Sequence, residues 1–176
     1  RDDPQRAPRG VAELRRLDPE SVAVSLVFSF LNPAHERQLL EAVAAALPGI
    51  PVYASHDINP QLEEWPRAST TAMAAYVGPV VTRYVDELEA TLREIGFAGA
   101  LQFMRSDGGV ATPRATRENP AHMLTSGLAG GVTAAVKLCR DLRLDAAVTL
   151  DVGGTSADLA AITGGQSRSR MSRVID

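Results

Sequence analysis

The order of apolar and polar residues in the first third of the chain predicts two strands joined by a helix. Residues 21–28 (SVAVSLVF) form an apolar run of strand length with almost no polar alternation, which is typical of a strand covered on both faces. Residues 32–49 begin with Asn-Pro and end with Pro-Gly, the signals of a helix start and a helix stop. A second run, 50–55 (IPVYAS), completes a β–α–β unit and predicts a parallel strand pair.

The middle of the chain predicts a long helix between residues 61 and 95, because apolar side chains recur there at helical spacing. Pro79 is expected to break or bend this helix, since proline lacks the N–H that a helix needs, and Gly96 is expected to end it. A short strand at 99–104 and another helix between 124 and 142 follow. The apolar stripe of the long helix consists of Val77, Val81, Tyr84, Leu88 and Ile95.

Two apolar segments near the C-terminal end predict a β-hairpin around the motif DVGGTSAD at 151–158. Together the elements predict the α/β class, with a mostly parallel central sheet, helices on both of its faces and a C-terminal β-hairpin. The charged, proline-containing residues 1–20 are expected to form a surface segment or linker, and residues 21–176 one central α/β part.

Composition narrows the class of protein. The 176 residues are 45% hydrophobic and 22% charged, as in ordinary globular domains. The net charge of -3 argues against a protein whose main function is to bind nucleic acid. The single cysteine, Cys139, cannot form an internal disulfide and fits a reducing compartment. No apolar run reaches membrane-spanning length. We therefore expect a cytoplasmic protein that binds neither nucleic acid nor membranes.

Three glycine-rich clusters carry the candidate chemistry: RSDGG (105–109), TSGLAGG (125–131) and DVGGTSAD (151–158). Each follows a strand or opens a helix, where open α/β sheets place ligand crevices. Glycine lets the backbone approach an anion closely, and a helix start offers unpaired N–H groups to a phosphate. The candidate phosphate-binding residues are Ser126, Gly127, Gly130, Gly131, Gly153, Gly154, Thr155 and Ser156.

The two aspartates of the third cluster add charge to this pattern. Asp151 is placed to hold Mg²⁺ or to orient an attacking water, and Asp158 to tie the loop together by accepting backbone hydrogen bonds. A plainer interpretation also stands, in which the clusters are ordinary turns and a close-packed helix entry. None of them has the spacing of a Walker P-loop or of a dinucleotide-binding fingerprint.

Other polar residues are weaker candidates. The three histidines, His35, His56 and His122, are too dispersed to predict a metal pair on one helix face. Arg67, with Thr70 and Thr71, can either contact an anionic substrate or brace a helix, and bracing is favoured.

The chain resembles the hydantoinase A / 5-oxoprolinase family of the actin-like ATPase superfamily, over roughly residues 10–165. The resemblance rests on several motifs in the right order: "NPAHE", "EEWPRASTT", "RSDGGV", "LTSGLAGGVTAA" and "LDVGGTSADLA". It implies part of the ribonuclease H-like fold of that superfamily, with a second phosphate loop at 151–158. It also implies that Ser106, Asp107, Gly108 and Gly109 line the substrate cleft, and that Asp151 is the catalytic and metal-binding residue.

The resemblance implies an enzyme that uses ATP and Mg²⁺ to phosphorylate the carbonyl of a cyclic amide such as 5-oxoproline or a hydantoin. A subunit of an ATP-dependent ketone carboxylase, or a non-catalytic interaction module with this fold, are the alternatives. A second hydantoinase or carboxylase subunit is a possible partner. The family's earlier phosphate hairpin and its adenosine segment are not visible in these 176 residues, so we expect this stretch alone to be inactive.

Overall fold

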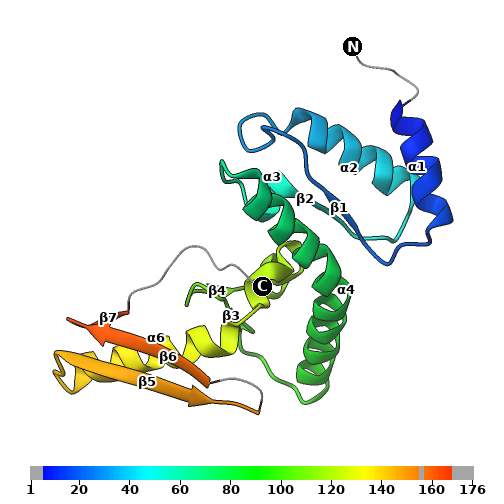
Figure 1. Cartoon of the computed structure of the whole chain (residues 1–176). Coiled ribbons are helices and arrows are strands. Elements are labelled where there is room, and N and C mark those ends of the chain that lie inside the picture. The colour runs from blue at the N-terminus through cyan, green and yellow to red at the C-terminus, as the bar shows by residue number, and fades with distance from the viewer. Residues whose placement is uncertain (1–5, 155–156, 168–176) are drawn as a thin grey trace. The chain divides into compact units, whose positions relative to one another are not determined.

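The computed structural model describes residues 6–154 and 157–167, which fold into two compact units. The first unit comprises the chain up to Gly99 together with Arg114–Ala121, and the second comprises Ala100–Pro113 and the chain from His122 onward. Both contain helices and strands, which confirms the α/β class (Figure 1). None of the described helices is long and apolar enough to cross a membrane.

The first unit contains the predicted β–α–β arrangement. Strands β1 (Val22–Val24) and β2 (Val52–Ala54) pair in parallel, and α2 (Ala34–Ala46) connects them. Strand β1 is shorter than the apolar run that predicted it, because the N–H of Leu26 turns away to donate to the carboxylate of Glu36 (2.7 Å). The chain therefore leaves the sheet two residues after Val24.

Helix α1 (Arg6–Arg16) lies in the segment that the sequence predicts as a surface segment or linker. Val11 and Leu14 of this helix pack against the core cluster formed by the two strands and α2. The division of the chain at residue 20 stays a prediction, but the described part of that first segment is a packed helix. Its apolar residues bury surface that a linker would leave in water.

Helix α4 (Glu64–Glu94) is continuous through Pro79, so of the two predicted outcomes, a break or a bend, the break does not occur. Proline cannot donate to the carbonyl four residues earlier, which here belongs to Ala75. The hydroxyl of Ser21 donates to that carbonyl at 2.6 Å and replaces the missing helical bond. The helix does end as predicted, since Gly96 has a positive φ of 74° and the N–H of Phe97 reaches the carbonyl of Leu92.

The buried face of α4 differs from the predicted apolar stripe. Tyr84 and Ile95 of that stripe are exposed, whereas the buried positions carry mostly small or polar side chains. Small residues allow the helix to lie close to the strands, and the phenol of Tyr53 occupies the space that a side chain at Gly78 would fill. The buried positions are Arg67, Thr71, Ala74, Ala75, Gly78 and Val85.

Two short helices complete the first unit. Helix α3 (Ser55–Ile58) follows β2 directly, and Ile58 packs with Tyr53 and small residues of α4. Helix α5 (Pro113–Glu118) is tied to α4 by Arg117, whose guanidinium pairs with Asp86 and Glu89.

The second unit consists of a small hairpin, a helix and a larger hairpin, and it contains the predicted C-terminal β-hairpin. Instead of one mostly parallel sheet, the described strands form three small sheets, of which only the β1–β2 pair is parallel. The elements of the second unit are β3 (Phe103–Met104), β4 (Val110–Ala111), α6 (Ser126–Asp141), β5 (Ala146–Val152), β6 (Ala157–Thr163) and β7 (Gln166–Ser167). The 3-10 helix η1 (Pro120–Met123) contains the point where the chain passes from the first unit into the second.

Candidate functional site

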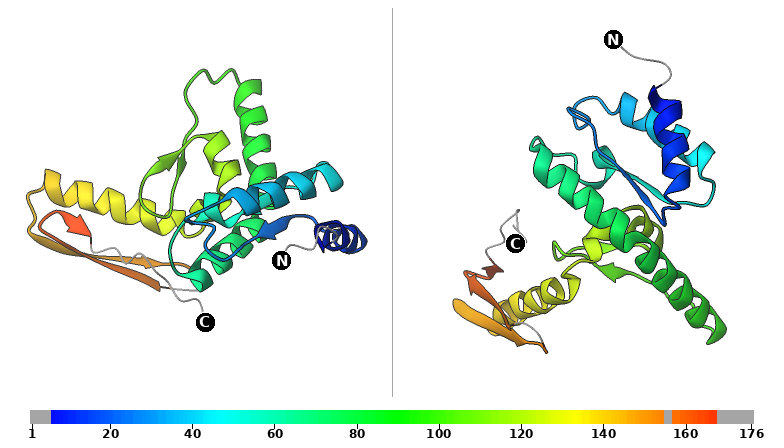
Figure 2. Two further views of the ribbon diagram at one scale, coloured as in Figure 1. Left: turned by 90° about the horizontal axis from the view of Figure 1, so that it is seen from above. Right: turned by 45° about the vertical axis from the view of Figure 1, so that its right-hand side comes forward.

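All three glycine clusters lie in the second unit, and the course of the chain brings two of them to the same end of it. Helix α6 is about 24 Å long, and β5, about 23 Å long, returns along it after the short connection at 142–145. At the C-terminal end of α6, Arg140 donates to the carbonyl of Gly165 (3.0 Å) in the β6–β7 turn. The C-terminal end of β5 therefore lies toward the start of α6, as Figures 1 and 2 show.

Asp151 and Asp158 face one another across the hairpin. They are register partners in the antiparallel β5–β6 pair, so both side chains project from the same face of the sheet. That face also carries Ile162, which is buried, and it is the face that packs on α6. Two carboxylates in directly opposed positions repel one another, and a divalent cation with oxygen ligands relieves such repulsion. The pair therefore suits Mg²⁺ by its donor atoms.

The described glycines after Asp151 are open to solvent. Gly153 and Gly154 are exposed, and a side chain added at Gly154 would meet nothing within 4 Å. Packing therefore does not explain why position 154 is a glycine. Thr155 and Ser156, which the sequence predicts as phosphate-binding residues, lie outside the described residues.

The start of α6 presents unpaired backbone donors. Thr125 precedes the helix in the left-handed conformation (φ 58°, ψ 18°), and its hydroxyl does not cap the helix. The first N–H groups of the helix, from Ser126 onward, are thus left for another acceptor. Gly127 and Gly131 have open space where a side chain would lie, whereas Gly130 packs against Met104 at an ordinary 3.5 Å. Among these three glycines of α6, the plainer close-packing interpretation holds for Gly130 only.

The RSDGG cluster forms the turn between β3 and β4. The Asp107 carboxylate accepts from the N–H of Gly109 (2.9 Å) and from Arg105 Nη2 (2.6 Å). The Gly109 N–H, followed by the Arg105 charge, holds the pKa of Asp107 below its usual value, although partial burial opposes this. Gly108 has a φ of 83°, and an added Cβ would lie 2.8 Å from Thr133 Oγ1 of α6. Turn geometry and close packing account for this glycine.

The same turn is joined to the segment before α6. The N–H of Ser106 donates to the carbonyl of His122 at 2.7 Å, and the side chains of Ser106 and Asp107 remain exposed. Burial, and next the nearby charge of Arg105, lower the pKa of His122, with Asp107 acting in the opposite direction. The His122 ring is therefore neutral at neutral pH. The first and second glycine clusters thus form one connected surface of the second unit.

A second polar cluster, in the first unit, is not predicted by the sequence pattern. Glu36 is fully buried, and its carboxylate accepts from Ser55 Oγ (2.6 Å) and from both the N–H (3.0 Å) and Nδ1 (2.7 Å) of His56. Ser29 Oγ lies 2.9 Å from Ser55 Oγ. These residues follow the carboxyl ends of β1 and β2 or open α2. Their separation along the chain left no local signal, and the parallel pairing brings them together.

Arg67 braces this edge, as the sequence interpretation favoured. Its guanidinium donates to the carbonyls of Leu26 (3.0 Å) and Gln61 (2.9 Å) and lies 5.4 Å from the centre of the Phe30 ring. Thr71, one turn further along α4, donates back to the Arg67 carbonyl (2.7 Å). The side chain is 1% exposed, so in the first unit it acts as a structural tie rather than as a surface group for substrate.

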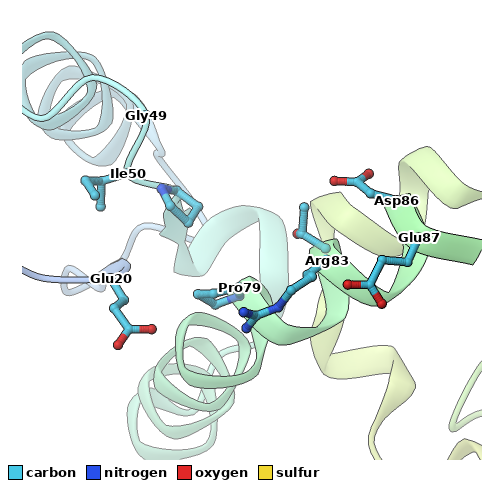
Figure 3. Close-up of a pocket in the computed structure, with 9 residues that line it drawn as sticks. Glu20, Gly49, Ile50, Pro79, Arg83, Asp86 and Glu87 are labelled. Atoms are coloured by element: carbon cyan, nitrogen blue, oxygen red, sulfur yellow. The ribbon is translucent and has the colours of Figure 1, made fainter. Parts of the chain in front are cut away.

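The first unit also has an open hollow of about 710 Å³, which none of the predicted site residues lines. Its lining comes from the segments just before β1 and β2 and from the middle of α4, and Figure 3 shows Glu20, Arg83, Asp86 and Glu87 around it. The hollow thus lies at the amino ends of the two strands. Within residues 6–154 and 157–167, no group of three or more His, Cys, Asp or Glu side chains could hold a metal ion.

The chain is similar to a known protein family and to several known proteins. Residues 67–175 match the sequence profile of the Hydantoinase/oxoprolinase family. The chain is 35% identical over 153 residues to caprolactamase subunit alpha of Pseudomonas jessenii, a match that covers 87% of this chain and 22% of that protein. It is 30% identical over 142 residues to 5-oxoprolinase of Saccharomyces cerevisiae (80% of this chain, 11% of that protein).

The fold is also similar to that of a solved acetone carboxylase, determined without nucleotide in work on ATP-dependent acetone carboxylation. The TM-score is 0.81 at 30% identity, with 91% of this chain and 23% of that chain covered. The chain therefore spans about a quarter or less of the proteins that it matches. The profile match over more than half of the chain, with these relatives, shows that the chain belongs to the hydantoinase/oxoprolinase family.

Proposed function

We propose that the whole protein containing this chain is an ATP-dependent enzyme that opens cyclic amides of the 5-oxoproline or hydantoin type. The observation that carries the proposal is the shared end of α6 and the β5–β6 hairpin. There an uncapped helix start, an open glycine turn and two facing aspartates lie in one unit. Such a combination suits a phosphate with its magnesium ion, because backbone N–H groups hold the anion and carboxylates hold the cation.

Each group has a separate task in this proposal. The N–H groups of Ser126 and Gly127 and those of Gly153 and Gly154 bind phosphate oxygens, and Thr155 and Ser156 stay predicted phosphate-binding residues. Asp151 holds Mg²⁺, commonly through water, or orients the attacking water. Asp158 fixes the loop opposite it. Ser106 and Asp107, exposed on the neighbouring turn, face the amide substrate.

ATP supplies the chemistry that the chain itself lacks, by transferring its terminal phosphoryl group to the amide oxygen. Water then adds to the activated carbon, the C–N bond breaks with a proton passing to nitrogen, and a second water releases phosphate from the acyl group. The sum is amide, ATP and two waters giving an amino acid, ADP and phosphate. The protein contributes mainly positioning and charge stabilisation, as is usual in phosphoryl transfer.

Two alternatives remain distinct from this function. The structural similarity to acetone carboxylase supports a carboxylase subunit, in which a carbon nucleophile takes up bicarbonate-derived carbon. A non-catalytic module would keep the fold without binding nucleotide. A bicarbonate requirement for ATP turnover identifies the carboxylase, and absence of nucleotide binding by the whole protein identifies the module.

A second subunit is part of the proposal. The relative from Pseudomonas is named as subunit alpha, which supports a multi-chain assembly. The matched stretch is 22% of that relative but 11% of the yeast 5-oxoprolinase, which is therefore roughly twice as long. A chain of double length has room for the functions of two subunits. The whole protein should thus be assayed with any chain that co-purifies in stoichiometric amount.

The experiment that tests the function compares Asp151→Asn with Asp145→Asn in the whole protein. Asp151 is one of the facing pair, whereas Asp145 is exposed at the opposite end of β5 and serves as the matched control. We expect Asp151→Asn to lower 5-oxoproline- or hydantoin-dependent ADP release by about 100-fold or more, as for removal of a group that stabilises a transition state. Equal activity of the two variants would refute the assigned role of the hairpin.

A further inference from the structure

The described cations of the second unit are unevenly distributed along α6. Lys137 and Arg140 belong to the C-terminal half of the helix, where Lys137 pairs with Asp141 (2.5 Å). Arg105 lies beside the other half, because the β3–β4 turn that contains it packs on α6 through Gly108 and Met104. In the part of the second unit that the structure describes, Lys137, Arg140 and Arg143 thus belong to the C-terminal half of α6 or follow it, whereas Arg105 lies beside the half at which the proposed phosphate site begins.

The Arg105 side chain is held in place but has donors to spare. Its backbone is fixed at both ends of the turn, since its N–H donates to the carbonyl of Gly109 (2.8 Å) and its carbonyl accepts from Gly108 (3.0 Å). Of its guanidinium, Nη2 donates to Asp107, whereas the buried Nε has no partner within the described residues. Buried donors are nearly always paired in folded proteins, so an unpaired one needs an explanation. The side chain as a whole is one-third exposed, so a ligand can reach the part of the guanidinium other than the buried Nε.

The charges around Arg105 favour a weak, singly charged anion over a polyphosphate. Asp107 carries a negative charge at neutral pH, because its pKa is lowered, and it cancels much of the Arg105 charge. His122 is neutral at that pH and adds no second positive charge. A carboxylate matches this balance, and it also matches the forked geometry in which guanidinium donors bind two oxygens at once.

We propose that Arg105 is a substrate-binding residue that selects a cyclic amide bearing a carboxylate, as in 5-oxoproline, over a neutral lactam of the same ring size. This inference rests on the proposed function and assigns a residue to its substrate. Ser106 and Asp107, the exposed neighbours of Arg105, lie on the same turn, so the carboxylate of the substrate is bound at the β3–β4 turn. The amide carbonyl is then directed toward the start of α6 and the β5–β6 hairpin.

The test compares two substrates that differ only in the carboxylate, 5-oxoproline and 2-pyrrolidinone, with the whole protein and its second subunit if one co-purifies. ADP and amino acid release are measured for Arg105→Gln, for Arg105→Lys and for the control Lys137→Gln, which removes an ion-paired cation from the other half of α6. We expect Arg105→Gln to lower kcat/KM for 5-oxoproline roughly 10- to 100-fold, as for one charged hydrogen-bonded pair. Turnover of 2-pyrrolidinone and the unfolding temperature should stay unchanged.

The remaining outcomes separate the inference from the function on which it rests. Arg105→Lys keeps the charge and should retain more 5-oxoproline turnover than Arg105→Gln. A wild type that does not prefer 5-oxoproline, or an Arg105→Gln variant that loses both substrates equally, would overturn the inference and leave the ATP-dependent function standing. A wild type that opens neither lactam nor a hydantoin with ATP would refute the proposed function itself.

Discussion

Substitution of Glu36 by alanine tests what holds the carboxyl edge of β1 and β2 together. The buried carboxylate accepts four hydrogen bonds, from the N–H of Leu26 (2.7 Å), the N–H (3.0 Å) and ring (2.7 Å) of His56 and the hydroxyl of Ser55 (2.6 Å). Alanine removes every acceptor at once and leaves these donors inside the first unit. The strand ends and the start of α2 then lose their common tie.

The expected cost follows from those contacts. Each buried donor left unpaired costs about 1–3 kcal/mol. Contributions from one shared carboxylate do not add fully, and Ser55 keeps a second partner in Ser29 at 2.9 Å. We therefore expect Glu36→Ala to lower the free energy of unfolding by about 3–5 kcal/mol.

Urea unfolding of the 176-residue chain, followed by circular dichroism, measures this change. Glu41→Ala is the matched control, because Glu41 is exposed on the same helix, and its effect should stay within about 0.5 kcal/mol. Glu36→Gln keeps one acceptor oxygen and should fall between the two. A loss below about 1 kcal/mol for Glu36→Ala would contradict the view that the carboxylate is fully hydrogen-bonded and buried.

The pH dependence gives an independent check. Burial raises the pKa of Glu36, but hydrogen bonds from Ser55, from the His56 ring and from two backbone N–H groups together lower it below its usual 4.5. A carboxyl whose pKa is lowered by folding stabilises the folded state above the unfolded value, and this contribution is lost as the pH falls through the folded one. The free energy of unfolding of the wild type should therefore fall more steeply between pH 6 and acidic pH than that of Glu36→Gln. The difference in slope corresponds to about one proton taken up by Glu36 when the wild type unfolds. Equal slopes would refute the argument.

Three further substitutions probe packing by urea unfolding. Ser21→Ala removes the hydroxyl that covers the free carbonyl of α4 and should cost about 1 kcal/mol; no loss would mean that water replaces it. Gly78→Ala puts a methyl group into the Tyr53 phenol and should cost about 2 kcal/mol or more; an unchanged midpoint would contradict the close approach. Gly108→Ala should cost about 1–3 kcal/mol, and Thr133→Ala should restore part of it; a loss that Thr133→Ala does not reduce would assign the cost to the backbone alone.

Local sequence patterns predicted the elements whose signals lie within a few residues. Periodicity, glycine placement and strand-forming residues act locally. They therefore predicted the parallel β–α–β unit, the end of α4 at Gly96 and the C-terminal hairpin. The sequence located the glycine clusters for the same reason. The sequence did not predict whether Asp107 binds a substrate or only its own turn. In the structure, Arg105 and Gly109 both donate to its carboxylate.

Contacts between distant residues decided the rest. Pro79 continues its helix because Ser21, more than fifty residues earlier, supplies the missing hydrogen bond, and no helix pattern contains that information. Likewise Glu36 becomes a buried centre only when β2 lies beside β1 and brings His56 to it.

The sequence alone thus determined the order of the elements and the chemical types available to the site. Only the tertiary structure decided which of these groups meet. Asp151 and Asp158 are seven positions apart, yet they face one another because the hairpin register pairs them. The C-terminal end of β5, which carries Asp151, lies near the start of α6 because β5 returns along that helix over a matching length. Register and packing are properties of the folded backbone, since they depend on buried area and hydrogen bonds summed over the whole unit.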